Sequence, residues 1–249
     1  MAGNKRAQVT LFVIIAIVIV AGVLLLFALK PELNPLAKEP EPSGYIETCM
    51  RDSASQALDL LSTQGGTLKP TGYAMYNNEK VSYLCYTSNY YSKCVNQQPM
   101  LKYSVESEIT DYIKPKIQQC ISNLKQQYQK KGYTVETGVM QLKTTLQPKK
   151  VIVDLSMPLT LKKEEAKRYE SFQSIVLHPI YDHIMLSQEI VNSETHYGDY
   201  DQLSYMLYKP QTSIDKKPVG ENTIYILKDR NSDKRFLFAV RSYVMPPGF

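Results

Sequence analysis

Tryptophan is absent from this chain of 249 residues, and histidine occurs only three times. The sequence also lacks Gly-x-Ser-x-Gly, His-Glu-x-x-His, Gly-x-x-x-x-Gly-Lys-Ser/Thr and Gly-x-Gly-x-x-Gly. These motifs carry the nucleophile of α/β-hydrolases, the zinc site of many metalloproteases, and phosphate- or dinucleotide-binding loops. Their absence excludes recognisable members of those enzyme classes. We therefore expect a non-enzymatic protein without catalytic residues and without a cofactor.

A strong charge of either sign is also missing. The chain has 29 Lys and Arg residues against 24 Asp and Glu, and two of the basic residues, Lys5 and Arg6, lie at the N-terminus. The remainder is then close to balance, with a net charge of +3. Binding to nucleic acid usually requires a basic stripe or patch. Because none is present, we expect no nucleic-acid partner.

One long hydrophobic run is present, at residues 9–29. About 20 apolar residues in a helix span the ~30 Å hydrocarbon core of a bilayer, so the run predicts a transmembrane helix that binds the lipid bilayer. No second run of this length follows. The rest of the chain is therefore expected to lie on one side of the membrane.

The residues that flank the run predict its orientation. Lys5 and Arg6 precede it without any acidic residue, whereas Lys30 on the other side is followed by Glu32. The positive-inside rule then places residues 1–8 in the cytoplasm and the body outside the cell membrane. The alternative is a cleaved signal peptide, which has an apolar segment of about 7 to 15 residues and a small-x-small cleavage site. The run is longer than this, and Leu29-Lys-Pro31 is not such a site, so we expect a retained single-pass anchor.

A proline-rich segment, residues 30–43, follows the predicted anchor. Its prolines at 31, 35, 40 and 42 prevent the membrane helix from continuing. An extended segment of this length reaches up to about 40 Å at ~3.1 Å per residue. It predicts a stalk that carries one extracytoplasmic domain, residues 44–249.

Hydrophobic periodicity predicts two long amphipathic helices in this domain, over residues 45–63 and 105–131. Gly65-Gly66 and Gly132 are expected to end them. Pro115 lies inside the second helix and predicts either a kink near residues 111–113 or two helices placed end to end.

Strand patterns occupy much of the remaining chain. Residues 72–76 and 80–86 predict one pair, residues 133–146 are interrupted at Gly138, and residues 151–161 alternate between apolar and polar side chains. Pro158 predicts an edge or a bulge in that last strand. Residues 163–176 and 179–193 have helical spacing, and residues 223–227 and 235–244 predict a hairpin. We expect an α+β fold in which the two long helices pack on one mostly antiparallel sheet, built from residues 133–161 and the terminal hairpin.

All four cysteines lie beyond the predicted anchor, and none belongs to a Cys-x-x-Cys motif. Zinc sites usually need closely spaced ligands, so we expect no metal and two disulfide bonds, as is usual outside the cytoplasm. Of the three pairings, we predict Cys49 with Cys120, because both cysteines lie on the apolar faces of the long helices. Cys85 then pairs with Cys94 across a short loop.

Tyrosine is abundant, with 19 residues, and several cluster between residues 73 and 91. Tyrosine favours strands for structural reasons, but it is also a frequent contact residue at interfaces. Tyr90 and Tyr91 lie in the loop between Cys85 and Cys94. We therefore regard these two as the candidates for contact with a partner.

Two polar groupings are weaker candidates for chemistry. His178, Asp182 and His183 do not all share one helix face, so we expect surface or capping roles for them. Asp199 and Asp201 provide too few oxygen atoms for a calcium ion, and we expect them in a solvated loop.

The sequence resembles an uncharacterised family of single-span, membrane-anchored archaeal surface proteins. The residues that carry this resemblance are Lys5-Arg-Ala-Gln-Val-Thr-Leu-Phe12, Tyr45-Ile-Glu-Thr-Cys49, Ala57-Leu58, Gln64-Gly-Gly66, the helix with Cys120, and Arg235-Phe-Leu-Phe-Ala-Val-Arg241. The resemblance implies a location at the cell surface and no particular activity.

A second, local resemblance is to the N-termini of archaeal type IV prepilins, at Lys5-Arg-Ala-Gln8 before the apolar run. The chain differs from such pilins at Phe12, where they carry an acidic residue, and at Pro31 and Pro35, where their anchor helix continues. We expect a non-catalytic binding or assembly component of the cell envelope with a protein partner there. A type IV pilin-like filament subunit and an envelope hydrolase are the alternatives, and the oligomeric state stays open.

Overall fold

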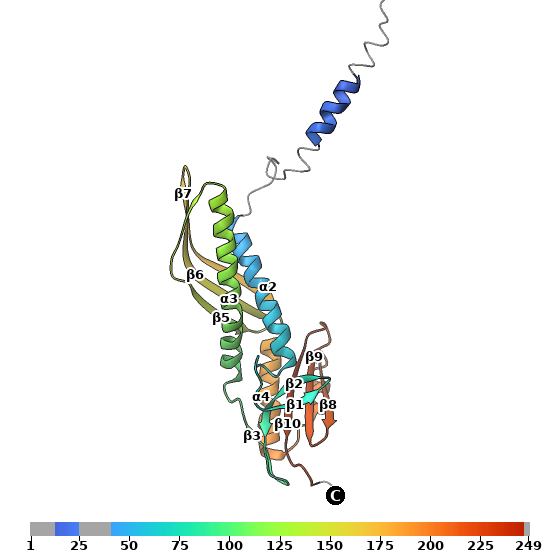
Figure 1. Cartoon of the computed structure of the whole chain (residues 1–249). Helices are drawn as coiled ribbons and strands as arrows, with labels where there is room; N and C mark the ends of the chain where they lie inside the picture. The colour runs from blue at the N-terminus through green and yellow to red at the C-terminus, as the bar shows by residue number, and fades with distance from the viewer. Residues whose placement is uncertain (1–12, 25–40, 247–249) are drawn as a thin grey trace, which may run out of the picture. The chain divides into compact units, whose positions relative to one another are not determined.

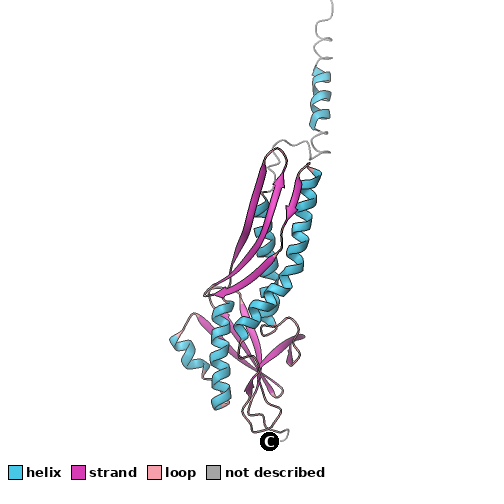
Figure 2. Cartoon of the chain, turned by 90° about the vertical axis from the view of Figure 1, so that its left-hand side faces the viewer, coloured by secondary structure: helices cyan, strands magenta, loops and turns pink. Residues whose placement is uncertain are grey.

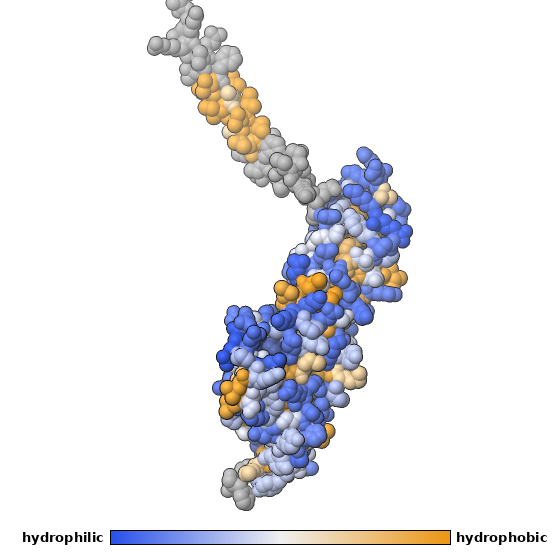
Figure 3. All heavy atoms as spheres, turned by 180° about the vertical axis from the view of Figure 1, so that it is seen from behind, coloured by the Kyte–Doolittle hydropathy of each residue, from blue (hydrophilic) through white to orange (hydrophobic). Residues whose placement is uncertain are grey.

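The computed structural model describes residues 13–24 and 41–246, and the chain separates after Glu41 into two units. In the first unit, residues 13–24 form a helix with an apolar surface (Figure 3). Among the described residues, no helix has both the length and the hydrophobicity needed to cross a membrane. Residues 9–12 and 25–29 of the predicted span, and residues 30–40 of the predicted stalk, lie outside the described residues.

The second unit has an α+β fold, as the sequence predicts. Its helices are α2 (Pro42–Thr63), α3 (Leu101–Lys130), α4 (Ile180–Tyr197) and α5 (Gln202–Tyr208). Its strands are β1 (Tyr73–Tyr76), β2 (Glu79–Tyr86), β3 (Val95–Asn96), β4 (Thr134–Thr137), β5 (Gln141–Gln147), β6 (Lys150–Lys162), β7 (Ala166–Leu177), β8 (Thr212–Val219), β9 (Asn222–Asp229) and β10 (Arg235–Arg241).

The two long helices, α2 and α3, lie side by side (Figure 1). Apolar residues recur every three or four positions along each helix and are buried between them and the sheets. The bond between Cys49 and Cys120 joins the two helices in the predicted pairing, with a Cα–Cα distance of 6.6 Å. Helix α3 runs through Pro115 without interruption, so the alternative of two helices end to end is wrong. Helix α2 begins at Pro42, and the last two residues assigned to the stalk therefore belong to it.

Four antiparallel strands form the first sheet, in which β6 is central. Strand β7 pairs along one edge of β6, while β5 and then β4 pair along the other. Helices α2 and α3 pack against this sheet, as Figure 2 shows. The predicted alternation in β6 is confirmed, because every second residue from Val151 to Leu161 is buried. The register shifts between Ser156 and Leu159, so the bulge predicted at Pro158 is also present.

The second sheet has the strand order β1-β2-β10-β9-β8, with β3 paired to β2. Strands β9 and β10 are the predicted terminal hairpin, but they pair with β2 and β8 rather than with residues 133–161. The prediction of a single sheet is therefore wrong. The β2–β10 pair is parallel, and the other pairs of this sheet are antiparallel. Tyr225, Phe236 and Phe238 fill its core, and α4 packs against β2, β3 and β10.

Residues 163–176 do not form the predicted helix, because Ala166–Leu177 is strand β7. Its buried positions alternate at Phe172, Ser174 and Val176, and the polar side chain of Ser174 hides this alternation from the sequence pattern. Helix α4 confirms the prediction for residues 179–193 and continues to Tyr197. Helix α5 and strand β8 occupy a stretch where the sequence predicts no element.

Candidate functional site: a tyrosine-lined groove and a bridged loop

Strand β2 carries two of the tyrosines that cluster between residues 73 and 91, namely Tyr83 and Tyr86. The residue just before β1 and the residue just after β3 both form backbone hydrogen bonds with the middle of β2. The Tyr83 backbone N–H donates to the Gly72 carbonyl at 3.0 Å, and the Gln97 N–H donates to the Leu84 carbonyl at 2.8 Å. A groove with a volume of about 630 Å³ lies at this place. Its lining residues are Thr71, Gly72, Tyr73, Ser82, Tyr83, Tyr86, Gln97 and Gln98.

Three tyrosine rings dominate the groove, and neighbouring side chains fix their positions. The rings of Tyr83 and Tyr86 have centroids 4.8 Å apart and are tilted by 54°. The Tyr83 hydroxyl donates to Asn222 Oδ1 at 2.8 Å, and burial raises the pKa of this phenol. Lys80 Nζ lies 4.6 Å from the ring centroid of Tyr73. These contacts hold the rings before any ligand arrives.

The loop between Cys85 and Cys94 borders this groove. The predicted bond between these cysteines is present, with a Cα–Cα distance of 5.3 Å. Tyr90 and Tyr91, the two predicted contact residues, are 42% and 55% exposed. The backbone of Tyr91 has a φ of 54°, and its N–H donates to the Val244 carbonyl at 2.9 Å. The disulfide bond therefore fixes both ends of the loop, and the backbone hydrogen bond of Tyr91 fixes its middle.

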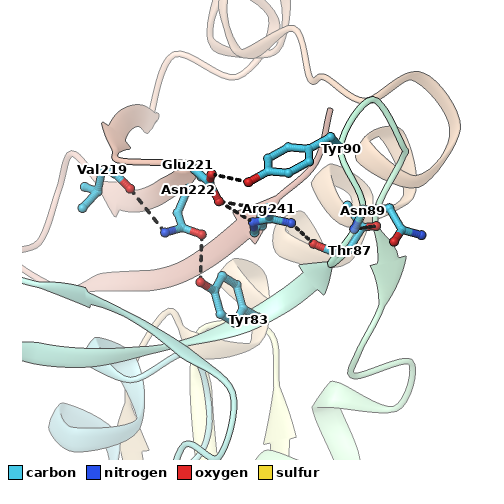
Figure 4. Close-up of polar contacts among 8 residues, drawn as sticks. All are labelled: Tyr83, Thr87, Asn89, Tyr90, Val219, Glu221, Asn222 and Arg241. Atoms are coloured by element: carbon cyan, nitrogen blue, oxygen red, sulfur yellow. Dashed lines mark hydrogen bonds and ion pairs between the residues drawn. The ribbon is translucent and has the colours of Figure 1, made fainter. Parts of the chain in front are cut away.

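A buried arginine connects this loop to the second sheet (Figure 4). Arg241 is 8% exposed, and its Nη1 donates to the Thr87 carbonyl. Its Nε and Nη2 donate to Glu221 Oε2 at 3.2 and 2.7 Å. The Tyr90 hydroxyl donates to the other oxygen of Glu221 at 3.2 Å. The guanidinium also lies 5.6 Å from the Tyr90 ring centroid, so one cation orders both the backbone and an aromatic side chain of the loop.

The electrostatics of this cluster match its geometry. The hydrogen bond from Arg241 lowers the pKa of the Glu221 carboxyl, which therefore remains ionised at neutral pH. The same ion pair raises the pKa of Arg241. Arg241, Glu221 and Asn222 also belong to this site, although the sequence did not predict it. Their only signal is that Arg241 ends an otherwise apolar strand, Phe236 to Val240.

The histidines differ from their predicted surface role. His178 and His183 are only 4% and 3% exposed, so for them the surface interpretation is wrong. The capping interpretation is right for His178, whose Nδ1 accepts the Ile180 N–H at 3.1 Å near the start of α4. Asp182 Oδ2 accepts the Lys149 N–H at 3.3 Å.

His183 lines a separate cavity of about 230 Å³ together with Asp182, Tyr205, Lys209 and Asp229 among others. Neither of its ring nitrogens has a hydrogen-bond partner among the described residues. Burial lowers the pKa of His178 and of His183 to about 4. The cavity is smaller than the roughly 300 Å³ at which ligand sites usually begin. We therefore take the tyrosine groove, rather than this cavity, as the candidate functional site.

The acidic pair, Asp199 and Asp201, has protein partners. Lys216 Nζ donates to Asp199 Oδ1 at 2.5 Å. Asp201 caps α5 by accepting the N–H groups of Leu203 and Ser204 at 3.1 and 3.2 Å. In the part of the chain that the structure describes, no group of three acidic, histidine or cysteine residues is arranged to hold a metal ion.

Comparisons with known proteins do not extend this description. No family model, no curated protein and no solved structure matches the chain. The assignment of a function therefore depends on the residues and geometry above.

Proposed function

We propose that the chain is a membrane-anchored, extracytoplasmic protein that acts as a non-catalytic binding or assembly component of the cell envelope. The observation that carries this proposal is the bridged loop, in which a buried arginine and a disulfide hold two exposed tyrosines in place. Tyrosine offers a large contact area at low cost in conformational entropy. A loop that is already ordered loses less entropy on binding, which favours affinity.

Two further observations support the location. Both disulfide bonds pair cysteines of one chain, and such bonds persist in oxidising compartments outside the cytoplasm. The apolar run at residues 9–29 has the length of a membrane span, and basic residues precede it. Together they favour a domain held outside the membrane by a single N-terminal helix.

The filament alternative makes a different prediction about the N-terminus. A pilin-like subunit is processed directly before its apolar helix, so its mature chain starts at Gln8. A retained anchor keeps Lys5 and Arg6. N-terminal sequencing of the protein isolated from membranes separates the two. The hydrolase alternative would need a catalytic group in the cavity that His183 lines. The low pKa of His183 keeps this imidazole neutral at pH 7.

The proposed contact can be tested by photo-crosslinking in native membranes. A photoreactive phenylalanine analogue at Tyr91 is expected to capture a discrete protein partner, because this side chain is 55% exposed on the ordered loop. The matched control places the same analogue at Tyr208 on α5, which is 81% exposed and remote in sequence. An adduct from Tyr91 that is absent from Tyr208 supports the proposal. No adduct from Tyr91, or the same adducts from both positions, would refute it.

A further inference from the structure

The groove beside the loop has a lining without any charged side chain. Its eight residues contribute three phenol rings, hydroxyl groups and side-chain amides. Burying a charged group without a partner is costly, so such a lining disfavours a charged ligand. The volume of about 630 Å³ falls within the range of roughly 300 to 1,000 Å³ found for ligand sites. The groove therefore suits an uncharged ligand several residues long.

The aromatic rings form ridges rather than one flat platform. Tyr83 and Tyr86 are tilted by 54° at a centroid distance of 4.8 Å, which leaves an angled recess between them. Tyr73 enters the groove from β1, the neighbouring strand. Proline-rich segments dock in grooves of this aromatic type, because their side-chain rings fit between the aromatic ones. A sugar ring would instead favour a single open aromatic face, on which its C–H groups can stack.

The rigidity of the rings adds to this fit. Tyr83 is fixed by its hydrogen bond to Asn222, and the Arg241 guanidinium lies 5.8 Å from the centroid of Tyr86. The bond from Cys85 fixes the strand on which both tyrosines stand. A polyproline II segment is itself preformed and loses little entropy on binding. When both partners are already ordered, binding costs less conformational entropy, and the affinity is higher for the same contacts.

The polar groups of the groove match the backbone of such a segment. Proline has no N–H, so a proline-rich chain presents carbonyl acceptors that lack internal partners. The Tyr83 hydroxyl is already bonded to Asn222, but the other tyrosine hydroxyls, the threonine hydroxyl and the glutamine amides of the lining can donate to these carbonyls. Gln98 provides a side-chain amide, while its backbone N–H and carbonyl are held by Asn96 and Gln188. The side-chain amide of Gln98 is thus carried by a backbone that hydrogen bonds hold in place.

From these observations we propose that the tyrosine groove binds an uncharged, proline-rich peptide segment of its partner in the polyproline II conformation. This inference rests on the proposed function and specifies the chemistry of the partner.

The test is a titration of the full-length protein in detergent with a labelled, uncharged proline-rich 12-residue peptide, followed by fluorescence anisotropy. Saturable binding is expected. Tyr73→Ala is expected to weaken it at least tenfold, and because Tyr73 is 37% exposed the variant should fold. Gln98→Ala is expected to weaken it by a smaller factor. Tyr208→Ala, far more exposed and outside the groove, is expected to leave it unchanged.

Two further ligands sharpen the result. A peptide of the same length with glycine in place of proline is expected to bind at least tenfold more weakly, and a neutral oligosaccharide is expected not to compete. The inference is overturned if the proline-rich peptide does not bind, if Tyr73→Ala binds it as wild type does, or if the oligosaccharide displaces it. Crosslinking from Tyr91 is an independent readout. A captured partner together with no peptide binding would refute the ligand class and leave the proposed function standing.

Discussion

Replacing Cys49 and Cys120 together by alanine is expected to lower the free energy of unfolding by about 4 kcal/mol. The bond spans 71 residues in sequence, and closing a loop of this length restricts the unfolded chain by roughly that amount in the chain-entropy model. The bond joins α2 to α3, whose apolar faces pack together. Urea denaturation at neutral pH, with the midpoint and slope fitted together, measures the change.

The second disulfide provides the matched comparison. Cys85 and Cys94 are only 9 residues apart, and the same relation gives about 2.5 kcal/mol for their replacement by alanine. The Cys49/Cys120 double variant should therefore be the less stable of the two. Equal losses, or a larger loss for the Cys85/Cys94 double variant, would show that loop closure does not determine the stabilisation.

Acidification is expected to destabilise the domain through His178 and His183. Both imidazoles have a pKa of about 4 in the folded protein, against an ordinary value of about 6.5. The unfolded chain therefore takes up their protons first as the pH falls. The stabilisation is complete above pH ~6.5 and decreases as the pH falls towards 4. A shift of this size corresponds to about 3 kcal/mol for each histidine.

Some groups around the two histidines lower their pKa values and others raise them. Burial is the main cause of both low pKa values, and Lys234 and His183 lower that of His178 further. Asp59 opposes the shift of His178, and Asp229 opposes that of His183. Glu194 acts oppositely on stability. Burial raises the pKa of this carboxyl, and the hydrogen bond that it accepts from Tyr225 opposes the shift. The folded state therefore holds the proton of Glu194 more tightly than the unfolded chain does, so protonation of Glu194 favours the folded state.

The pH dependence can be assigned with variants. Urea unfolding is measured between pH 7.5 and 4.5 for wild type, for His178→Gln with His183→Gln, and for His196→Asn as a control at an exposed position. The double variant is expected to lose less stability over this range than wild type, whereas the His196 variant should follow wild type. If the double variant loses as much stability as wild type, the buried histidines do not govern the acid response.

Hydrophobic periodicity predicts those helices and strands that bury a single face. The regular rows of apolar residues in α2 and α3 and the alternation in β6 appear in the sequence because each packs against a single buried surface. Strand β7 was missed because Ser174, a polar residue, occupies a buried position. The division into two sheets was also missed. It depends on the parallel pairing of β2 with β10, which lie about 150 residues apart.

The candidate site also contains residues that local sequence patterns predict and residues that they do not. The cluster of tyrosines and the short cysteine loop are visible locally, and the structure brings Tyr73, Tyr83 and Tyr86 together in one groove. Arg241 and Glu221 reach the loop only through the long-range β2–β10 pairing. The burial of His183 is predictable from its position in the sequence. It lies three residues after Ile180 and beside Ile184, on the face of α4 that is buried.

We propose that the folded domain lies outside the cell on a retained N-terminal anchor. Protease treatment of intact cells, with immunoblotting against both ends of the chain, tests this most directly. We predict that the domain from Pro42 onwards is removed and that a small membrane fragment with residues 9–29 remains. A cytoplasmic marker should stay intact in the same sample. Complete protection of the domain in sealed cells, with digestion only after lysis, would contradict the account.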